Sequence, residues 1–127
     1  MDHGLLLVGA IFLTIGSLFG VVLVTAEVMK KSFPKPLGFI HPTLAMIGFL
    51  MIVARHFILG PLKYMDWGIL SLVGSVFFGL ALLVRGFRGL AMLRLFTFCH
   101  GMLGLLGLGL VLYQVSLRPG PLFSIGS

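Results

Sequence analysis

Four long apolar runs dominate the sequence, and most polar and charged residues lie between them. The runs cover residues 4–29, 37–59, 67–84 and 95–117. Each is close to the ~20 residues that an α-helix needs to cross the ~30 Å hydrocarbon core of a bilayer. Helix-breaking residues such as Pro34 and the pair Gly60–Pro61 separate the runs. The pattern predicts an all-α, single-domain, up-and-down bundle of four transmembrane helices, with a short extended tail at 118–127.

Composition supports a membrane protein and excludes a soluble one. Of 127 residues, 59% are hydrophobic and only 9% are charged, whereas about a quarter of the residues in a soluble domain are charged. The net charge of +6 would suggest nucleic acid as a partner of a soluble protein, but here the charges flank apolar spans, so we expect a lipid bilayer and no nucleic acid. Little chain lies outside the spans, so any chemistry has to occur among the helices or on a partner protein.

The distribution of Lys and Arg predicts an orientation in the membrane. Six of the nine lie in the first and third connections, and the other three are Arg55 near the end of the second run, Lys63 in the second connection and Arg118 near the C-terminus. The positive-inside rule then places the first and third connections in the cytoplasm and both termini outside, in a cell inner membrane. Nothing positive precedes the first run and no small-residue cleavage site follows it, so we expect a retained span and not a signal peptide.

Two histidines within the runs are candidates for chemistry, because each begins a row of small residues at helical spacing. His41 and His100 are each followed at positions i+4 and i+7, on the same helix face, by Ala or Gly. These small residues are Ala45 and Gly48 after His41, and Gly104 and Gly107 after His100. Counted from the start of its run, each ring lies roughly 6–9 Å inside the same edge of the hydrocarbon core. Two such faces opposite one another would leave a slot between two imidazoles.

The two histidines also match under an internal repeat. A shift of 59 residues aligns His41 with His100 and superimposes two helical hairpins of the same membrane orientation. The other aligned pairs are Gly16 with Ser75, Gly20 with Gly79, Ala45 with Gly104, Gly48 with Gly107, Phe19 with Phe78 and Phe39 with Phe98. Such a tandem duplication implies a pseudo-twofold axis along the membrane normal, with the histidines at equal depth on either side of it.

Paired imidazoles at one depth suit a bis-histidine b-type haem, with a nitrogen ligand on each side of the iron. The small residues would face the porphyrin, and Arg94 or its cationic neighbours at this membrane edge would pair with the propionates. Two alternatives stay open at this point. The histidines could be structural, bonding free backbone groups near helix starts, or each could ligate a separate chlorophyll-type pigment.

Arg55 and His56 form a second candidate site near the opposite membrane edge. His56 follows His41 by about four helical turns, but the matching position of the fourth run holds Val115, which cannot ligate iron. We therefore expect an interfacial pair, with quinone binding as the alternative. Glu27, the one carboxylate within an apolar run, has the spacing for an ion pair with Lys30 or Lys31.

At His41 and His100 the chain resembles the small four-helix membrane cytochromes of b type and the haem-carrying membrane anchors of respiratory complexes. The fragment Ala54-Arg55-His56-Phe57 is similar to the histidine motifs of succinate dehydrogenase anchor subunits, which usually have three spans. The resemblance implies a subunit of a larger complex that passes electrons between a quinone pool and a partner.

The expected function is therefore electron relay through one haem b in a respiratory or photosynthetic membrane complex, without catalysis of its own. No hydrolase, nucleotide-binding or redox-thiol motif is present, and Cys99 is the single cysteine. The alternatives are a cofactor-free accessory subunit of a larger membrane complex and a pigment-binding subunit.

Overall fold

A computed structural model describes residues 2–31 and 35–117, with side chains from Gly4 onward. The described chain is all-helical, which confirms the predicted fold class. The four helices are α1 (Asp2–Val28), α2 (Lys35–Leu59), α3 (Met65–Phe87) and α4 (Arg94–Leu117). All four are long and apolar enough to cross a membrane. The predicted extended tail at 118–127 lies outside the described residues.

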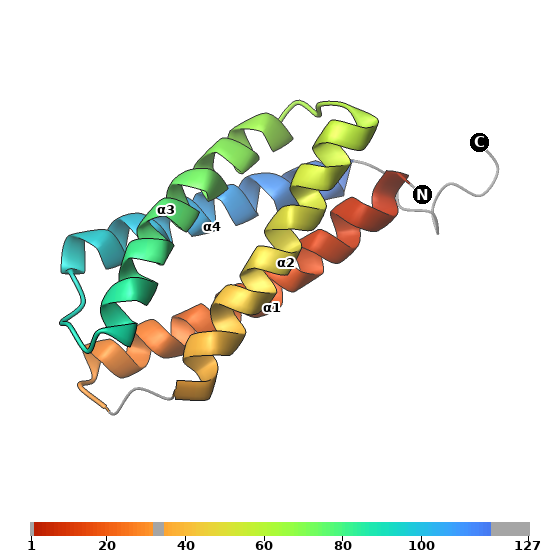
Figure 1. The fold of residues 1–127 in the computed structure, drawn as a ribbon. Coiled ribbons are helices and arrows are strands. Elements are labelled where there is room, and N and C mark those ends of the chain that lie inside the picture. The colour runs from red at the N-terminus through yellow and green to blue at the C-terminus, as the bar shows by residue number, and fades with distance from the viewer. Residues whose placement is uncertain (1, 32–34, 118–127) are drawn as a thin grey trace.

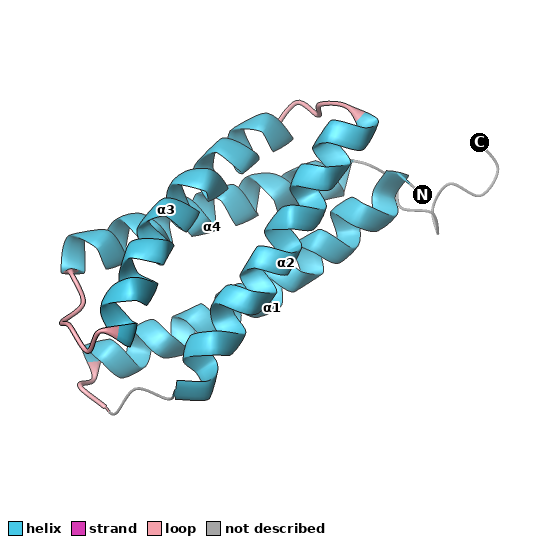
Figure 2. Ribbon diagram, viewed as in Figure 1, coloured by secondary structure: helices cyan, strands magenta, loops and turns pink. Residues whose placement is uncertain are grey.

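A residue in the left-handed backbone conformation follows each of the first three helices within two residues of the helix end. Gly60 follows α2 with a φ of 91°, and Gly89 follows α3 with a φ of 66°. Lys30 adopts the same conformation after α1, with a φ of 54°, although a side chain is unfavourable there. Short loops then join α2 to α3 and α3 to α4 (Figure 2).

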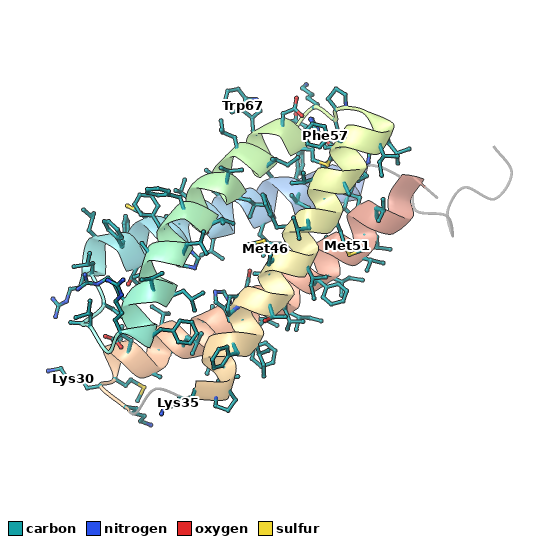
Figure 3. All side chains as sticks on the ribbon, viewed as in Figure 1. Lys30, Lys35, Met46, Met51, Phe57 and Trp67 are labelled. Atoms are coloured by element: carbon teal, nitrogen blue, oxygen red, sulfur yellow. The ribbon has the colours of Figure 1, made fainter. Side chains whose placement is uncertain are left out.

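Successive helices run in opposite directions, so the connections fall at two ends. The α1–α2 and α3–α4 connections share one end, while the start of α1, the α2–α3 turn and the end of α4 share the other (Figure 1). Lys30 and Lys35 mark the first end, and Phe57 and Trp67 mark the second (Figure 3). We call these the basic end and the aromatic end.

The bundle consists of two hairpins. Helix α1 packs mainly on α2, and α3 mainly on α4, with fewer contacts between α1 and α4 and between α2 and α3. Among the described residues, α2 has no backbone contact with α4, so these two helices are diagonal neighbours across the bundle centre.

The contacts inside the two hairpins repeat at the predicted offset of 59 residues. A Cβ on Gly9 would meet Ile52, Met51 and the Gly48 carbonyl, and a Cβ on Gly68 would meet Val111, Leu110 and the Gly107 carbonyl. The ends of the first helices repeat as well, because Lys31 donates its N–H to the Ala26 carbonyl and Leu90 to that of Arg85. The two hairpins thus share packing contacts and helix termination at equivalent positions.

The hydrophobic core occupies only the aromatic half of the bundle. Its buried members are Leu6, Ala10, Leu13, Ile52, Leu62, Met65, Leu72, Leu108 and Val111. In the basic half, no hydrophobic side chain among the described residues is fully buried. The buried core thus joins the two hairpins in the aromatic half. In the basic half they meet through exposed or half-buried rings, such as those of Phe39 and Phe87, whose centroids are 5.3 Å apart.

Large apolar side chains cover the outside of the bundle. Phe57 is 79% exposed, Trp67 66% and Phe77 68%, and many Leu, Ile and Val side chains on all four helices are exposed too. A soluble monomer rarely exposes apolar patches of this extent. This surface fits hydrocarbon, and the chain is a multi-pass membrane protein.

Candidate functional site

His41 and His100 meet at the centre of the bundle. Each is the seventh residue of its helix, since α2 starts at Lys35 and α4 at Arg94, so the rings lie at one depth. Their ring centroids are 5.9 Å apart, and the ring planes are nearly perpendicular at 81°. Because α2 and α4 are diagonal neighbours, the two imidazoles bridge the bundle interior, in the basic half that the hydrophobic core does not reach.

The His41 ring is anchored to the other helix of its own hairpin. Its Nδ1 lies 2.7 Å from the carbonyl oxygen of Gly16 on α1. A carbonyl can only accept, so Nδ1 carries the ring hydrogen and donates it.

The His100 ring has the same anchor at the equivalent position of the second hairpin. Its Nδ1 lies 2.8 Å from the Ser75 carbonyl oxygen on α3 and 3.1 Å from the Ser75 hydroxyl. The hydroxyl in turn donates to the backbone carbonyl of His100, at 2.9 Å. Ser75 therefore holds both the ring and the main chain of His100.

These bonds select the tautomer of both rings. A neutral imidazole with its hydrogen on Nδ1 keeps a free lone pair on Nε2, which is the atom that ligates a metal. Metal-bound histidines usually donate their other N–H to a carbonyl or carboxylate in this way. Among the described residues, Nε2 of neither ring has a hydrogen-bond partner. The structure thus presents two oriented Nε2 atoms, each with a lone pair that could ligate a metal.

Gly20 and Gly79 lie directly against the rings of His41 and His100. A Cβ on Gly20 would lie 2.8 Å from Cε1 of His41, and a Cβ on Gly79 would lie 2.8 Å from Cε1 of His100. Any side chain at these positions would push the ring away. From sequence, Gly16 and Gly20 belong to the internal repeat, and no contact with the histidines is predicted for them. One sequence signal could have identified this contact. Gly16 and Gly20 align with Ser75 and Gly79 at the same offset of 59 residues that aligns the two histidines.

The small residues that follow each histidine pack within their own hairpins. A Cβ on Gly48 would meet the Gly9 carbonyl at 2.6 Å, and a Cβ on Gly107 would meet Leu72 at 2.6 Å. Ala45 lies against Gly16 in the same way, and Gly104 lies against Ser75. These are helix-packing contacts, and a role of the four residues at a porphyrin face stays a prediction.

Arg94 is exposed at the start of α4, at the same end of the bundle as the histidines. Arg85, at the end of α3, donates from Nε to the Ala91 carbonyl at 2.8 Å. No ion pair joins Glu27 to Lys30 or Lys31 within the described chain. The expected ion pair is absent there because the left-handed turn at Lys30 ends the helical spacing on which it depended.

Arg55 and His56 lie at the aromatic end, apart from the histidine pair. Fourteen residues of helix separate Arg55 from His41, which corresponds to roughly 21 Å along the axis. Arg55 is only 2% exposed and donates from Nη1 to the Gly60 carbonyl at 2.6 Å. His56 Nδ1 lies 3.2 Å from a carboxylate oxygen of Asp66. Both residues thus fasten the turn between the two hairpins.

Gln114 is the counterpart of Arg55 at the same offset, and sequence reasoning gave it no such role. It is buried, and its Oε1 accepts a hydrogen bond from the Tyr64 N–H at 3.0 Å. Arg55 and Gln114 therefore hold the two ends of one turn.

Comparison of the chain with protein-family models, curated proteins and solved structures finds no match in any of the three. The function has to be argued from the site.

Proposed function

We propose that the protein binds one b-type haem between His41 and His100 and relays single electrons within the membrane. The observation that carries this proposal is the pair of imidazoles across the bundle centre, each with Nδ1–H donated to a backbone carbonyl and Nε2 free. Bound haem would supply an iron that alternates between two oxidation states. The chain would supply axial ligands, an apolar surrounding and, through Arg94 and its neighbours, positive charge near the propionates.

The spacing of the rings agrees with this ligation. Metal–imidazole bonds of about 2 Å on both sides of an iron separate the two ring centres by roughly 6 Å. The observed separation is 5.9 Å. Two pigments, each ligated by one histidine, would have to stack between the rings and would add roughly 3.5–4 Å to this distance. The geometry therefore favours one shared macrocycle over two separate pigments.

We propose a wider role for this haem site within a membrane complex. The resemblance to haem-carrying membrane anchors supports membership of a larger complex that exchanges electrons with a quinone pool. The contacts of Arg55 and His56 are those of a structural turn, so we do not place the quinone there. The orientation with the basic end in the cytoplasm rests on the positive-inside rule.

The test is an absorption spectrum of the detergent-purified protein, oxidised and then reduced, with extraction and quantification of haem. We expect haem b with the sharp reduced bands of a low-spin, six-coordinate iron. His100→Ala should abolish binding, and His56→Ala is the control because that histidine lies at the other end of the bundle. A colourless wild type would contradict the proposal and favour the accessory-subunit alternative. Far-red bands would favour the pigment alternative.

A further inference from the structure

The two hairpins present their histidines almost identically, but one position near the rings differs in chemistry. Where the first hairpin has Gly16, the second has Ser75. Both residues offer a backbone carbonyl to the ring of the facing histidine. Only Ser75 adds a hydroxyl, so the two nitrogen donors are held unequally.

The Ser75 hydroxyl connects the ring of His100 to its own backbone. It lies 3.1 Å from Nδ1 and 2.9 Å from the His100 carbonyl oxygen, and the serine side chain is only 5% exposed. Nδ1–H is thus shared between two oxygens of one residue, which restricts rotation of the ring. Acceptors on Nδ1–H also fix the orientation of a ring that ligates a metal.

The His41 side has fewer constraints. Its ring has one acceptor, the Gly16 carbonyl. Pro42 comes next in the helix and has no N–H, so it cannot donate to the carbonyl of Gly38 four residues earlier. At the equivalent position of α4, Gly101 keeps its N–H. The turn that carries His41 therefore has one backbone hydrogen bond fewer.

Building on the haem site proposed above, we propose that Ser75 is a positioning residue that makes His100 the anchoring ligand. His41 is then the ligand that can be lost without loss of haem. Without the His41 imidazole, His100 would hold the haem alone, and the α2 side would be left open to a small neutral ligand such as carbon monoxide.

The test compares His41→Ala with His100→Ala in the full chain, purified in detergent. We expect His41→Ala to keep most of its haem, to show a five-coordinate spectrum and to bind carbon monoxide when reduced. We expect His100→Ala to lose most of its haem. Adding Ser75→Ala to His41→Ala should weaken haem binding by roughly tenfold or more, the usual effect of removing a partner of a metal-ligating histidine.

Ser71→Ala is the matched control. Ser71 is a buried serine one turn away on α3 whose hydroxyl donates to the Leu103 carbonyl at 2.7 Å and not to a histidine. In the His41→Ala background this change should leave haem affinity unaltered. Circular dichroism and gel filtration check that each variant folds.

A second measurement does not depend on removing a ligand. With both histidines present, Ser75→Ala should release haem to excess apomyoglobin several-fold faster than Ser71→Ala. Equal haem loss in the two histidine variants, or equal release from the two serine variants, would overturn the role of Ser75 while leaving the haem site intact. A wild type without haem would overturn the haem site itself, and this inference with it.

Discussion

Substitution of Gly20 or Gly79 by a larger residue should disturb the site, because each glycine lies directly against a histidine ring. A methyl group there would approach Cε1 of the ring to 2.8 Å, closer than carbon atoms pack. The ring would have to tilt, and its Nδ1–H bond to the facing carbonyl would lengthen. In each variant, the Nε2 atom of the displaced ring would lose its orientation toward the bundle centre.

We therefore expect Gly20→Ala and Gly79→Ala each to lower haem content by about tenfold or more, with a loss of stability of about 1–3 kcal/mol from overpacking. The measurements are the haem-to-protein ratio and thermal unfolding in detergent. Gly101→Ala is the control, because a Cβ at Gly101, next to His100, would meet nothing within 4 Å. Normal haem content in Gly20→Ala and Gly79→Ala would contradict the position of the histidine rings against these glycines.

At the scale of the helices, comparison of the two hairpins identifies an unfavourable backbone conformation after α1. Lys30 has a left-handed backbone where the second hairpin has Gly89. Lys30→Gly should stabilise the protein by about 1 kcal/mol, because glycine adopts this conformation without a clash of its Cβ. Thermal unfolding in detergent measures the change. Lys31→Gly is the control, because it removes the same charge from a residue without positive φ. An equally large increase in stability in Lys31→Gly would refute the explanation.

The helices could be predicted from sequence, but their rotations could not. Continuous apolarity over a span length is enough to predict four membrane helices, and a titratable ring inside a span marks a site. Apolar residues occur around the whole circumference of each helix, so no polar face indicates which side turns inward. Hence Gly48 and Gly107, which sequence assigned to a slot between α2 and α4, lie against α1 and α3. The carbonyl partners of the histidines depend on the same helix packing and carry no sequence signal of their own.

At the scale of the whole molecule, tight packing and candidate chemistry lie in opposite halves of the bundle. The core and the residues Arg55 and Gln114 join the hairpins at the aromatic end. The histidines lie toward the basic end, where few buried side chains connect the hairpins. A cofactor bound there would itself link the two hairpins, so haem binding and bundle stability should be coupled.

The two ends also differ in charge, which leads to a prediction for the protein in the cell. The exposed Lys31 lies at the basic end and the exposed Lys63 in the α2–α3 turn at the other end. In a Cys99→Ser background, Lys31→Cys should resist a membrane-impermeant maleimide applied to intact cells, whereas Lys63→Cys should react, because connections rich in Lys and Arg stay in the cytoplasm. Permeabilised cells are the control, in which both positions should react. Labelling of Lys31→Cys alone in intact cells would invert the orientation and place the histidine pair near the outer surface of the membrane.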